Sequence, residues 1–160
     1  MPPPVHPRPP HPLARDLPRL LQLESIAFPH PGERFTLRQL QTLLRSPNAC
    51  IAHVRIDGVL AGWAIGLLRR HGPRARSGRL YGLVVHPDFR GRRLGAHLAN
   101  HVLRQLRRRG ARSFSLEVRS TNAPAIRLYT QIGFRPAEPL PNYYGPGLHG
   151  LRMRKIPPTP

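Results

Sequence analysis

The sequence predicts one domain of the mixed α/β class (α+β, mixed sheet), in which helices pack on a sheet with parallel and antiparallel strands. The chain has 160 residues, enough for one sizeable hydrophobic core. A strand hairpin occupies its first half, and strands alternate with helical patterns in its second half, which favours a mixed sheet. No repeat or composition break divides residues 13–156. The proline-rich residues 1–12 are expected to be poorly ordered or to form an edge strand, and 157–160 a tail.

Two helices are expected first. Apolar residues recur at helical spacing over 13–28, where Asp16 is a plausible N-cap and Pro18 suits an early helical position. After a loop, residues 36–46 read as a second helix capped by Thr36.

Strands follow these helices. Residues 49–70 contain two apolar runs joined at Asp57-Gly58, a dipeptide typical of a tight type I′ hairpin. A third strand is expected over 79–87, ended by Pro87 and Asp88.

A long helix is expected next. Over residues 94–110 a stripe of apolar side chains recurs every fourth residue, and Gly110 fits a helix stop. The remaining expected elements are a strand over 113–120, a helix over 122–133 capped by Asn122, and final strands over 133–138 and 149–156.

The charge of the chain is strongly positive. There are 26 Lys plus Arg against 7 Asp plus Glu, a formal net charge of +19, and Lys155 is the only lysine. This balance indicates weak non-specific binding to a polyanion such as nucleic acid or the ribosome. Because the arginines are scattered along the chain, a background set by genomic base composition is the competing explanation.

Other composition features narrow the class of protein. Cys50 is the only cysteine, so no intrachain disulfide and no cysteine zinc site is expected. His97 and His101 have a metal-compatible spacing but no obvious third ligand, and no metal is predicted. No apolar run reaches the length of a membrane span, about 18 residues, and the N-terminus lacks a signal-like apolar stretch. A cytoplasmic protein is therefore expected.

The segment "VVHPDFRGRRLGAHL", residues 84–98, is a candidate anion site. A strand is followed by a turn, a glycine-bearing loop and a helix start, whose free N–H groups and positive dipole end attract phosphates. It matches neither of the usual nucleotide fingerprints. A surface turn with solvated arginines is the alternative.

Two side chains in the second half carry candidate chemistry. Glu117 shares one face of its expected strand with Ser115 and Arg119, where a carboxylate needs either an arginine partner or a chemical role. Tyr129 lies at helical spacing with Ile126 and Leu128, which by itself is typical of a core tyrosine.

Residues 84–98 together with "LEVRSTNAPAIRLYTQIGF", residues 116–134, resemble the GNAT superfamily of acetyl-CoA-dependent N-acetyltransferases. Within it the chain is most similar to the ribosomal-protein-alanine N-acetyltransferase (RimI-like) group. The resemblance spans about residues 13–155 and implies the GNAT acyl-CoA N-acyltransferase fold. It also implies a first strand before residue 13; either residues 5–9 form a poor edge strand, where proline is tolerable, or this strand is missing.

The resemblance assigns roles to particular residues. Glu117 would be the general base, Tyr129 the general acid, and acetyl-CoA the co-substrate. The acceptor groove would include Phe28, Tyr143 and Tyr144. The residues implied to bind the coenzyme are Leu83, Val84, Val85, Arg90, Gly91, Arg92, Arg93, Leu94, Gly95, Ala96 and Asn122.

One of these residues departs from the family pattern. Arg93 stands where the family usually has a glycine. If this position needs a positive φ, the arginine is strained; if it already belongs to the first turn of the helix, the arginine costs little.

The function that follows is transfer of an acetyl group from acetyl-CoA to a primary amine by direct attack in a ternary complex. A protein or peptide N-terminal α-amine is the expected acceptor, and a small-molecule amine or amino acid is the alternative. A non-catalytic ribosome- or RNA-binding module with a GNAT-like scaffold is the alternative of another class. The protein is expected to be a monomer or a weak dimer, with no membrane partner.

Overall fold

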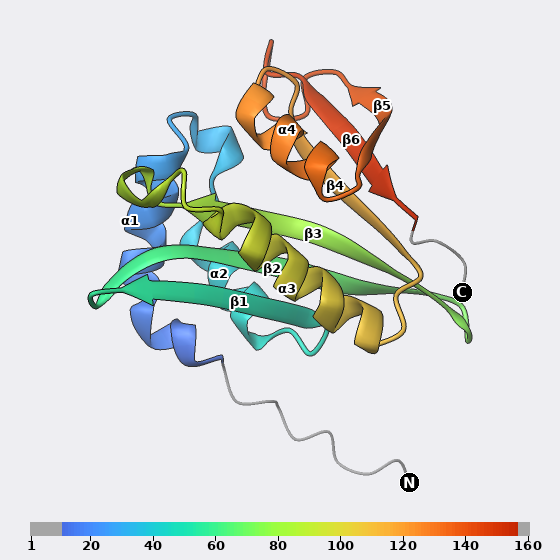
Figure 1. Cartoon of the computed structure of the whole chain (residues 1–160), viewed down its shortest axis with the longest axis horizontal. Helices are drawn as coiled ribbons and strands as arrows, with labels where there is room; N and C mark the ends of the chain where they lie inside the picture. The colour runs from blue at the N-terminus through green and yellow to red at the C-terminus, as the bar shows by residue number, and fades with distance from the viewer. Residues whose placement is uncertain (1–10, 157–160) are drawn as a thin grey trace, which may run out of the picture.

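The computed structural model describes residues 11–156 as helices packed on both faces of one sheet (Figure 1). The expected first strand at residues 5–9 lies outside the described residues. The helices are η1 (Pro12–Asp16), α1 (Leu17–Ala27), η2 (Pro31–Glu33), α2 (Leu37–Arg45), η3 (Pro87–Phe89), α3 (Leu94–Arg108) and α4 (Ala123–Gln131). The strands are β1 (Ala49–Ile56), β2 (Val59–His71), β3 (Ala75–Val85), β4 (Ser113–Arg119), β5 (Arg135–Leu140) and β6 (Gly150–Lys155). This confirms the predicted mixed class.

The strands form one six-stranded sheet in the order β1-β2-β3-β4-β6-β5. Every pair is antiparallel except β3–β4, which is parallel. That pairing is short: it runs from Ser77 opposite Ser113 to Arg79 opposite Ser115 and then stops. Beyond Arg79 the strands separate, so a wedge opens in the middle of the sheet.

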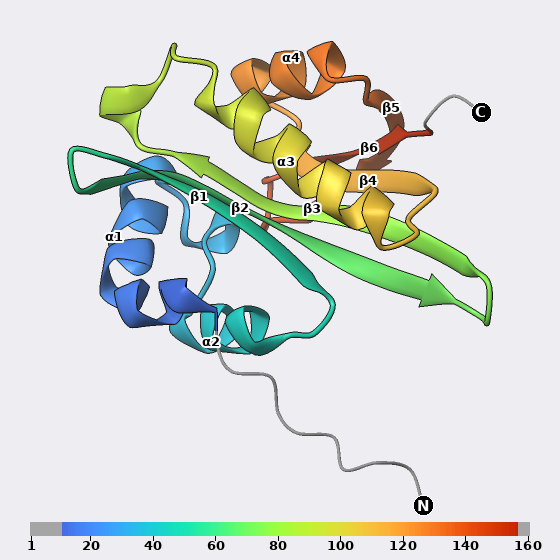
Figure 2. The ribbon, with the colours of Figure 1, turned by 60° about the horizontal axis from the view of Figure 1, so that its bottom comes forward.

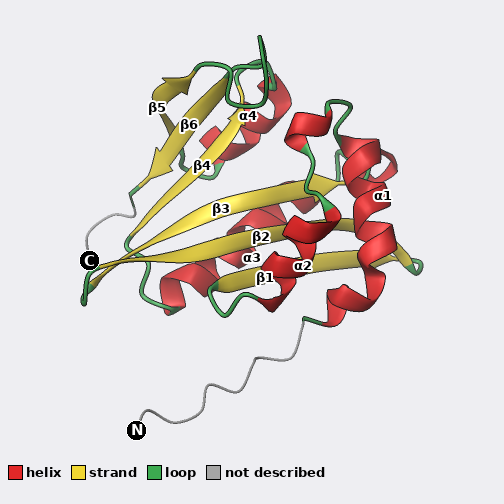
Figure 3. Cartoon of the chain, turned by 180° about the vertical axis from the view of Figure 1, so that it is seen from behind, coloured by secondary structure: helices red, strands yellow, loops and turns green. Residues whose placement is uncertain are grey.

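Each face of the sheet has its own core. On one face α3 packs across β1, β2 and β3, around buried side chains such as Leu98, Val102 and Leu106 (Figure 1). The opposite face is covered by α1 and α2, whose leucines enclose Trp63 and Ile65 of β2 (Figure 3). The edge-on view separates the two layers, with α1 and α2 on one side and α3 and α4 on the other (Figure 2).

Several local signals act as the sequence predicts. Thr36 caps α2 in a reciprocal capping box with Gln39. Asp57 and Gly58 both have positive φ, as a type I′ hairpin requires. Cys50 is buried in β1. Asp16 stands at the N-cap of α1, but its side chain makes no capping bond; its carboxylate pairs with Arg55 instead.

The third strand is longer than predicted. It begins at Ala75 rather than at Arg79, because residues 75–78 pair in register with the end of β2. No helix within residues 11–156 is long and apolar enough to cross a membrane.

Candidate active site

The wedge between β3 and β4 contains two adjoining cavities of about 300 and 680 Å³. The smaller one lies toward the loops at 28–35 and 141–149, and the larger one lies toward the loop at 90–95. Both sizes fall in the range of small-molecule sites. The residues that line both cavities are Phe28, Glu33, Leu83, Val84, Arg119, Asn122, Ala125 and Tyr129.

Leu83, Val84 and Val85 border the larger cavity, as the resemblance implies. The pairing of β3 with β4 has already ended at Arg79, so on this side the end of β3 has no neighbouring strand within residues 11–156. An extended chain with amide groups could therefore continue the sheet there by main-chain hydrogen bonds.

The loop that follows β3 leads directly into the first turn of α3. Gly91 has φ +79°, which glycine adopts without strain. No side chain caps α3 at Arg93, and the first N–H groups of a helix have no intrahelical partner. These groups and the helix dipole favour an anion at the end of the larger cavity, which Arg90, Gly91, Arg93, Leu94 and Gly95 line.

Arg93 adopts the left-handed conformation, with φ 59° and ψ 17°. It is therefore the N-cap residue, one position before the helix, and not part of the first helical turn. A non-glycine residue in such a conformation costs about 1–3 kcal/mol. The expectation of strain at a positive φ thus applies to this residue.

Two residues of the loop do not line the larger cavity. Arg92 lies over the ring of Phe89, with 5.3 Å between its guanidinium carbon and the ring centroid. Ala96 is in the first turn of α3 and is half-buried. Gly95 has a packing role as well, because a Cβ there would lie 2.8 Å from Leu128 of α4. Its lack of a side chain lets α3 and α4 approach each other.

Asn122 holds the start of α4 at the junction of the cavities. Its Oδ1 accepts a hydrogen bond from the N–H of Ala125 at 3.2 Å, which satisfies one of the orphan donors of the helix. Because this oxygen is occupied, the side chain offers its Nδ2–H group to a ligand.

Glu117 lies in the wedge on β4, with its side chain 7% exposed. Arg79 donates to its Oε2 at 2.7 Å, and Arg152 donates to its Oε1 at 3.2 Å. Of the two alternatives that the sequence left open for Glu117, an arginine partner or a chemical role, the arginine partners are present. The two neighbouring strands supply them, and sequence analysis identified neither: many arginines precede and follow Glu117, and only strand pairing selects these two.

Tyr129 comes from α4 and lines both cavities. Its side chain is 8% exposed and packs edge-to-face on Phe134, with ring centroids 6.2 Å apart. Burial raises the pKa of its hydroxyl well above the usual value, because the phenolate loses hydration. The group therefore holds its proton throughout the neutral range and can only donate it.

The acceptor-side residues expected from the resemblance lie together at the smaller cavity. Phe28, Tyr143 and Tyr144 all line it, and the two tyrosine rings meet edge-to-face at 4.9 Å. Burial, followed by the neighbouring Tyr143, raises the pKa of Tyr144. A Cβ on Gly32 would lie 2.0 Å from the carbonyl oxygen of Tyr144, so the loops at 28–35 and 141–149 touch beside the cavity.

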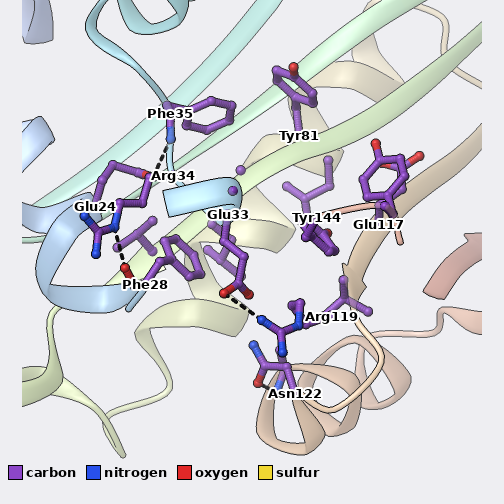
Figure 4. Close-up of a pocket in the computed structure, with 18 of the residues that line it drawn as sticks. Glu24, Phe28, Glu33, Arg34, Phe35, Tyr81, Glu117, Arg119, Asn122 and Tyr144 are labelled. Carbon is purple, nitrogen blue, oxygen red and sulfur yellow. Dashed lines mark hydrogen bonds and ion pairs between the residues drawn. The ribbon is translucent and has the colours of Figure 1, made fainter. Parts of the chain in front are cut away.

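Glu33 and Arg119 were not predicted as site residues from the sequence. Their side chains meet between the 28–35 loop and β4 (Figure 4). The distance from Arg119 Nη1 to Glu33 Oε2 is 3.1 Å, and their side chains are 14% and 11% exposed. The Nε of Arg119 is buried and has no hydrogen-bond partner in residues 11–156. Buried donors of this kind are nearly always paired in folded proteins, so this nitrogen is an exception.

Glu24 was also not selected. It is the buried charged side chain of the described region, 1% exposed. Burial raises its pKa from an ordinary value of 4.5 to about 7. The sequence places it at helical spacing on α1 and gives no signal that its carboxylate turns inward.

No cluster of three or more His, Cys, Asp or Glu side chains within residues 11–156 is arranged to hold a metal ion. His97 and His101 are exposed on α3.

Comparison with solved structures supports the fold. The ribosomal-protein-S18-alanine N-acetyltransferase of Escherichia coli is 24% identical, with a TM-score of 0.74 over 91% of this chain and 90% of that one. Arabidopsis thaliana Naa50, in complex with the bisubstrate analogue CoA-Ac-MVNAL, is 22% identical, with a TM-score of 0.76 over 88% of this chain and 92% of that one.

Curated proteins of similar sequence are also described as N-acetyltransferases. The [ribosomal protein bS18]-alanine N-acetyltransferase of Salmonella typhimurium is 45% identical over 65 residues, which are 41% of this chain and 44% of the relative. The match thus spans less than half of that protein. A putative enzyme of the same description from Bacillus subtilis is 28% identical over 130 residues, which are 81% of each chain.

The profile of the Acetyltransferase (GNAT) family matches residues 17–134. This segment includes the wedge, the loop at 90–96, Glu117 and Tyr129. The fold and the opening in the sheet are consistent with this match. The match shows that the chain belongs to the GNAT acetyltransferase family.

Proposed function

We propose that this chain transfers the acetyl group of acetyl-CoA to a primary amine, with a protein or peptide N-terminal α-amine as the acceptor. The observation that carries this proposal is the junction of the two cavities at Tyr129, inside the β3–β4 wedge. One cavity ends at an anion site suited to a pyrophosphate. The other is bordered by two loops and has a volume of about 300 Å³, and we assign it to the end of a peptide. The names of the bS18-alanine relatives support the same acceptor class.

Each part of the coenzyme has a proposed partner. The N–H groups of residues 91–96 and the arginines of that loop bind the pyrophosphate. Leu83, Val84 and Val85 pair with the pantetheine arm along the open edge of β3, and the Nδ2–H of Asn122 donates to the same arm. The thioester then lies at the junction, between Tyr129 and the acceptor cavity.

The chemistry is a direct displacement. The neutral amine attacks the thioester carbon, the N–C bond forms, and the tetrahedral intermediate collapses with cleavage of the C–S bond. One proton leaves the nitrogen and one reaches the sulfur. Glu117 accepts the first, directly or through a water molecule, and the buried hydroxyl of Tyr129 donates the second. A main-chain N–H at the end of β3 stabilises the oxyanion.

Thiol release from acetyl-CoA, followed with a panel of N-terminal peptides and small amines, tests this function. We expect peptides that begin with a small residue to be acetylated on the α-amine. Glu117→Gln should lower kcat about 100-fold or more, with the greatest loss at lower pH, and bind acetyl-CoA unchanged. If every amine fails although acetyl-CoA binds, the proposal is wrong and a binding module remains. If only small amines react, the acceptor class is wrong.

A second function, binding of RNA, is favoured by one specific observation. The β2–β3 hairpin and the end of α3 lie at the same end of the molecule (Figure 2), and both segments carry exposed arginines. The two segments touch there, since Arg76 Nη1 donates to the carbonyl of Arg109 at 2.8 Å. We name this the arginine surface, and it consists of Arg69, Arg70, Arg74, Arg104, Arg107, Arg108 and Arg112.

None of these side chains has an acidic partner within residues 11–156. Arg107 and Arg108 complement the negative end of the α3 dipole, but the hairpin arginines have no such role. An array of unpaired guanidinium groups suits a chain of phosphates.

The salt dependence of binding to a labelled single-stranded RNA tests this second function. A variant with Arg107, Arg108 and Arg112 changed to Gln should lower the slope of log K against log salt by about 2. Changing Arg38, Arg45 and Arg127 to Gln is the matched control, since it removes the same charge from α2 and α4. Equal losses in both variants would contradict a defined site and leave only the net charge.

A further inference from the structure

The buried carboxylate of Glu24 joins the last turn of α1 to the loop that borders the acceptor cavity. Its own main-chain carbonyl accepts the N–H of Phe28 at 3.0 Å, at the beginning of that loop. Its Oε2 accepts the N–H of Phe35 at 3.1 Å, at the end of the loop. The last main-chain bond of α1 thus fixes the beginning of the loop, and the Glu24 side chain fixes its end at Phe35 (Figure 4).

The loop between these contacts supplies acceptor-site side chains. Phe28, Glu33, Arg34 and Phe35 all line the smaller cavity. Arg34 closes the loop from within, because its guanidinium donates to the carbonyls of Phe28 and Pro29. The conformation of the loop thus sets the wall against which an acceptor would lie.

The surroundings of Glu24 suit an ionised carboxylate that acts only as an acceptor. Besides Phe35, the indole Nε1–H of Trp63 on β2 donates to Oε1 at 3.2 Å. Both partners are donors. A protonated carboxyl would direct its own hydrogen toward one of these N–H groups and lose that bond. The charged group that acts on Glu24 is Arg34 of the loop. The other titratable side chains that line the same cavity are Glu33 of η2, Arg79 and Tyr81 of β3, Glu117 and Arg119 of β4, Tyr129 of α4, and Tyr143 and Tyr144 of the loop at 141–149.

We propose that Glu24 is a positioning residue for the acceptor: its ionised carboxylate holds the loop at 28–35 in the conformation that forms the acceptor cavity. The proposal rests on the acetyltransferase function proposed above. Glu24 does not touch the reacting atoms; it acts through Phe28, Glu33 and Phe35. The N–H groups of Phe35 and Trp63 favour the ionised form of this carboxyl, whereas burial raises its pKa to about 7. We therefore expect the carboxyl to stay buried when it gains a proton below that pH, while the hydrogen bond that holds the loop weakens.

Trp63 allows the carboxylate to be observed without any substrate. It is the single tryptophan of the chain, and its indole donates directly to Glu24. Its fluorescence should therefore titrate with a midpoint near 7 in the wild-type protein. Glu24→Gln should abolish this transition, because glutamine does not ionise. A transition that persists in Glu24→Gln would overturn the assignment.

Peptide kinetics test the functional consequence. Glutamine offers one acceptor to two N–H donors, so above pH 7 Glu24→Gln should raise the acceptor KM about tenfold, with kcat and the KM for acetyl-CoA unchanged. Protonation of the acceptor amine affects both proteins equally, so the ratio of their KM values isolates Glu24. That ratio should fall toward one at low pH. A ratio independent of pH, or a loss in kcat alone, would contradict positioning.

Asp57→Asn is the matched control, because it removes a carboxylate from the distant β1–β2 turn and asparagine tolerates the same positive φ. It should leave both readouts unchanged. If Glu24→Gln does not fold, hydrogen exchange of the amides in the wild-type protein tests the proposal instead. The protection of the Phe35 N–H from exchange should decrease when the pH is lowered below 7, compared with the amides of the β1–β2 turn. Constant protection would overturn the proposal. If no amine is acetylated, the proposed acetyltransferase function is wrong. The fluorescence and amide-exchange measurements then still test whether Glu24 holds the loop.

Discussion

The β3–β4 wedge and the arginine surface use the same residue type in opposite ways. In the wedge, Arg79, Arg119 and Arg152 are each ion-paired with a glutamate. On the arginine surface the guanidinium groups are exposed and have no acidic partner within the described chain. The net charge of the chain therefore says little about the candidate active site, because the ion-paired arginines of the wedge contribute little to the electrostatic field outside the protein.

The physical reason is solvation. A half-buried ion pair is weakly screened by salt and fixes the positions of its partners, whereas an exposed charge is screened within about 10 Å. We therefore expect changes in the wedge to alter chemistry or acceptor binding, and changes on the arginine surface to alter only salt-dependent properties.

Tyr129→Phe should show the largest effect. Loss of the hydroxyl removes the proposed proton donor and should lower kcat by about 100-fold or more, while acetyl-CoA binding is retained because the ring still packs on Phe134. Steady-state kinetics and coenzyme titration measure the two effects. The Arg107, Arg108 and Arg112 to Gln variant should keep the wild-type kcat, and a comparable loss there would remove the distinction between the regions.

The pH dependence of stability should identify Glu24 as a buried carboxyl of the wedge. Its pKa is raised by folding from 4.5 to about 7, so the folded state binds more protons and this residue makes stability fall as pH rises between those values. Relative to Glu24→Gln, the free energy of unfolding of the wild type should fall by about 3 kcal/mol across that interval. Parallel curves in denaturant titrations would contradict the assignment.

Gly32→Ala should separate the two loops of the acceptor side. A Cβ at this position meets the main-chain oxygen of Tyr144 at 2.0 Å, and main chain cannot move aside as a side chain can. We expect kcat/KM for a peptide acceptor to fall about 10- to 100-fold, with acetyl-CoA affinity unchanged. An Ala substitution at the exposed Gly72, which has no neighbour within 4 Å, is the control for loop strain alone.

Arg93→Gly should have the smallest effect. Glycine adopts the left-handed conformation of this residue without strain, so the free energy of unfolding should rise by about 1 kcal/mol. Affinity for acetyl-CoA should fall only slightly, since main-chain N–H groups supply most of the proposed anion contacts. Thermal unfolding and coenzyme titration check both. A large loss of affinity would show that the Arg93 side chain itself binds the coenzyme.

The sequence by itself determined the elements and their order. Thr36 with Gln39, Asp57 with Gly58, and the apolar stripe of α3 are local signals, and the structure follows each of them. The residues proposed from the loop at 90–96 and from α4 came from contiguous motifs, because their spacing within one segment carries the pattern.

Only the tertiary structure decided which charged groups meet. Glu24 and Trp63 are 39 residues apart, Glu117 and Arg79 are 38 apart, and Glu33 and Arg119 are 86 apart. In a chain with 26 basic residues, spacing cannot select one partner. The strand register and the divergence of β3 from β4 determine the partner, because they fix which side chains meet in the buried part of the site. An unpaired charge would be costly there.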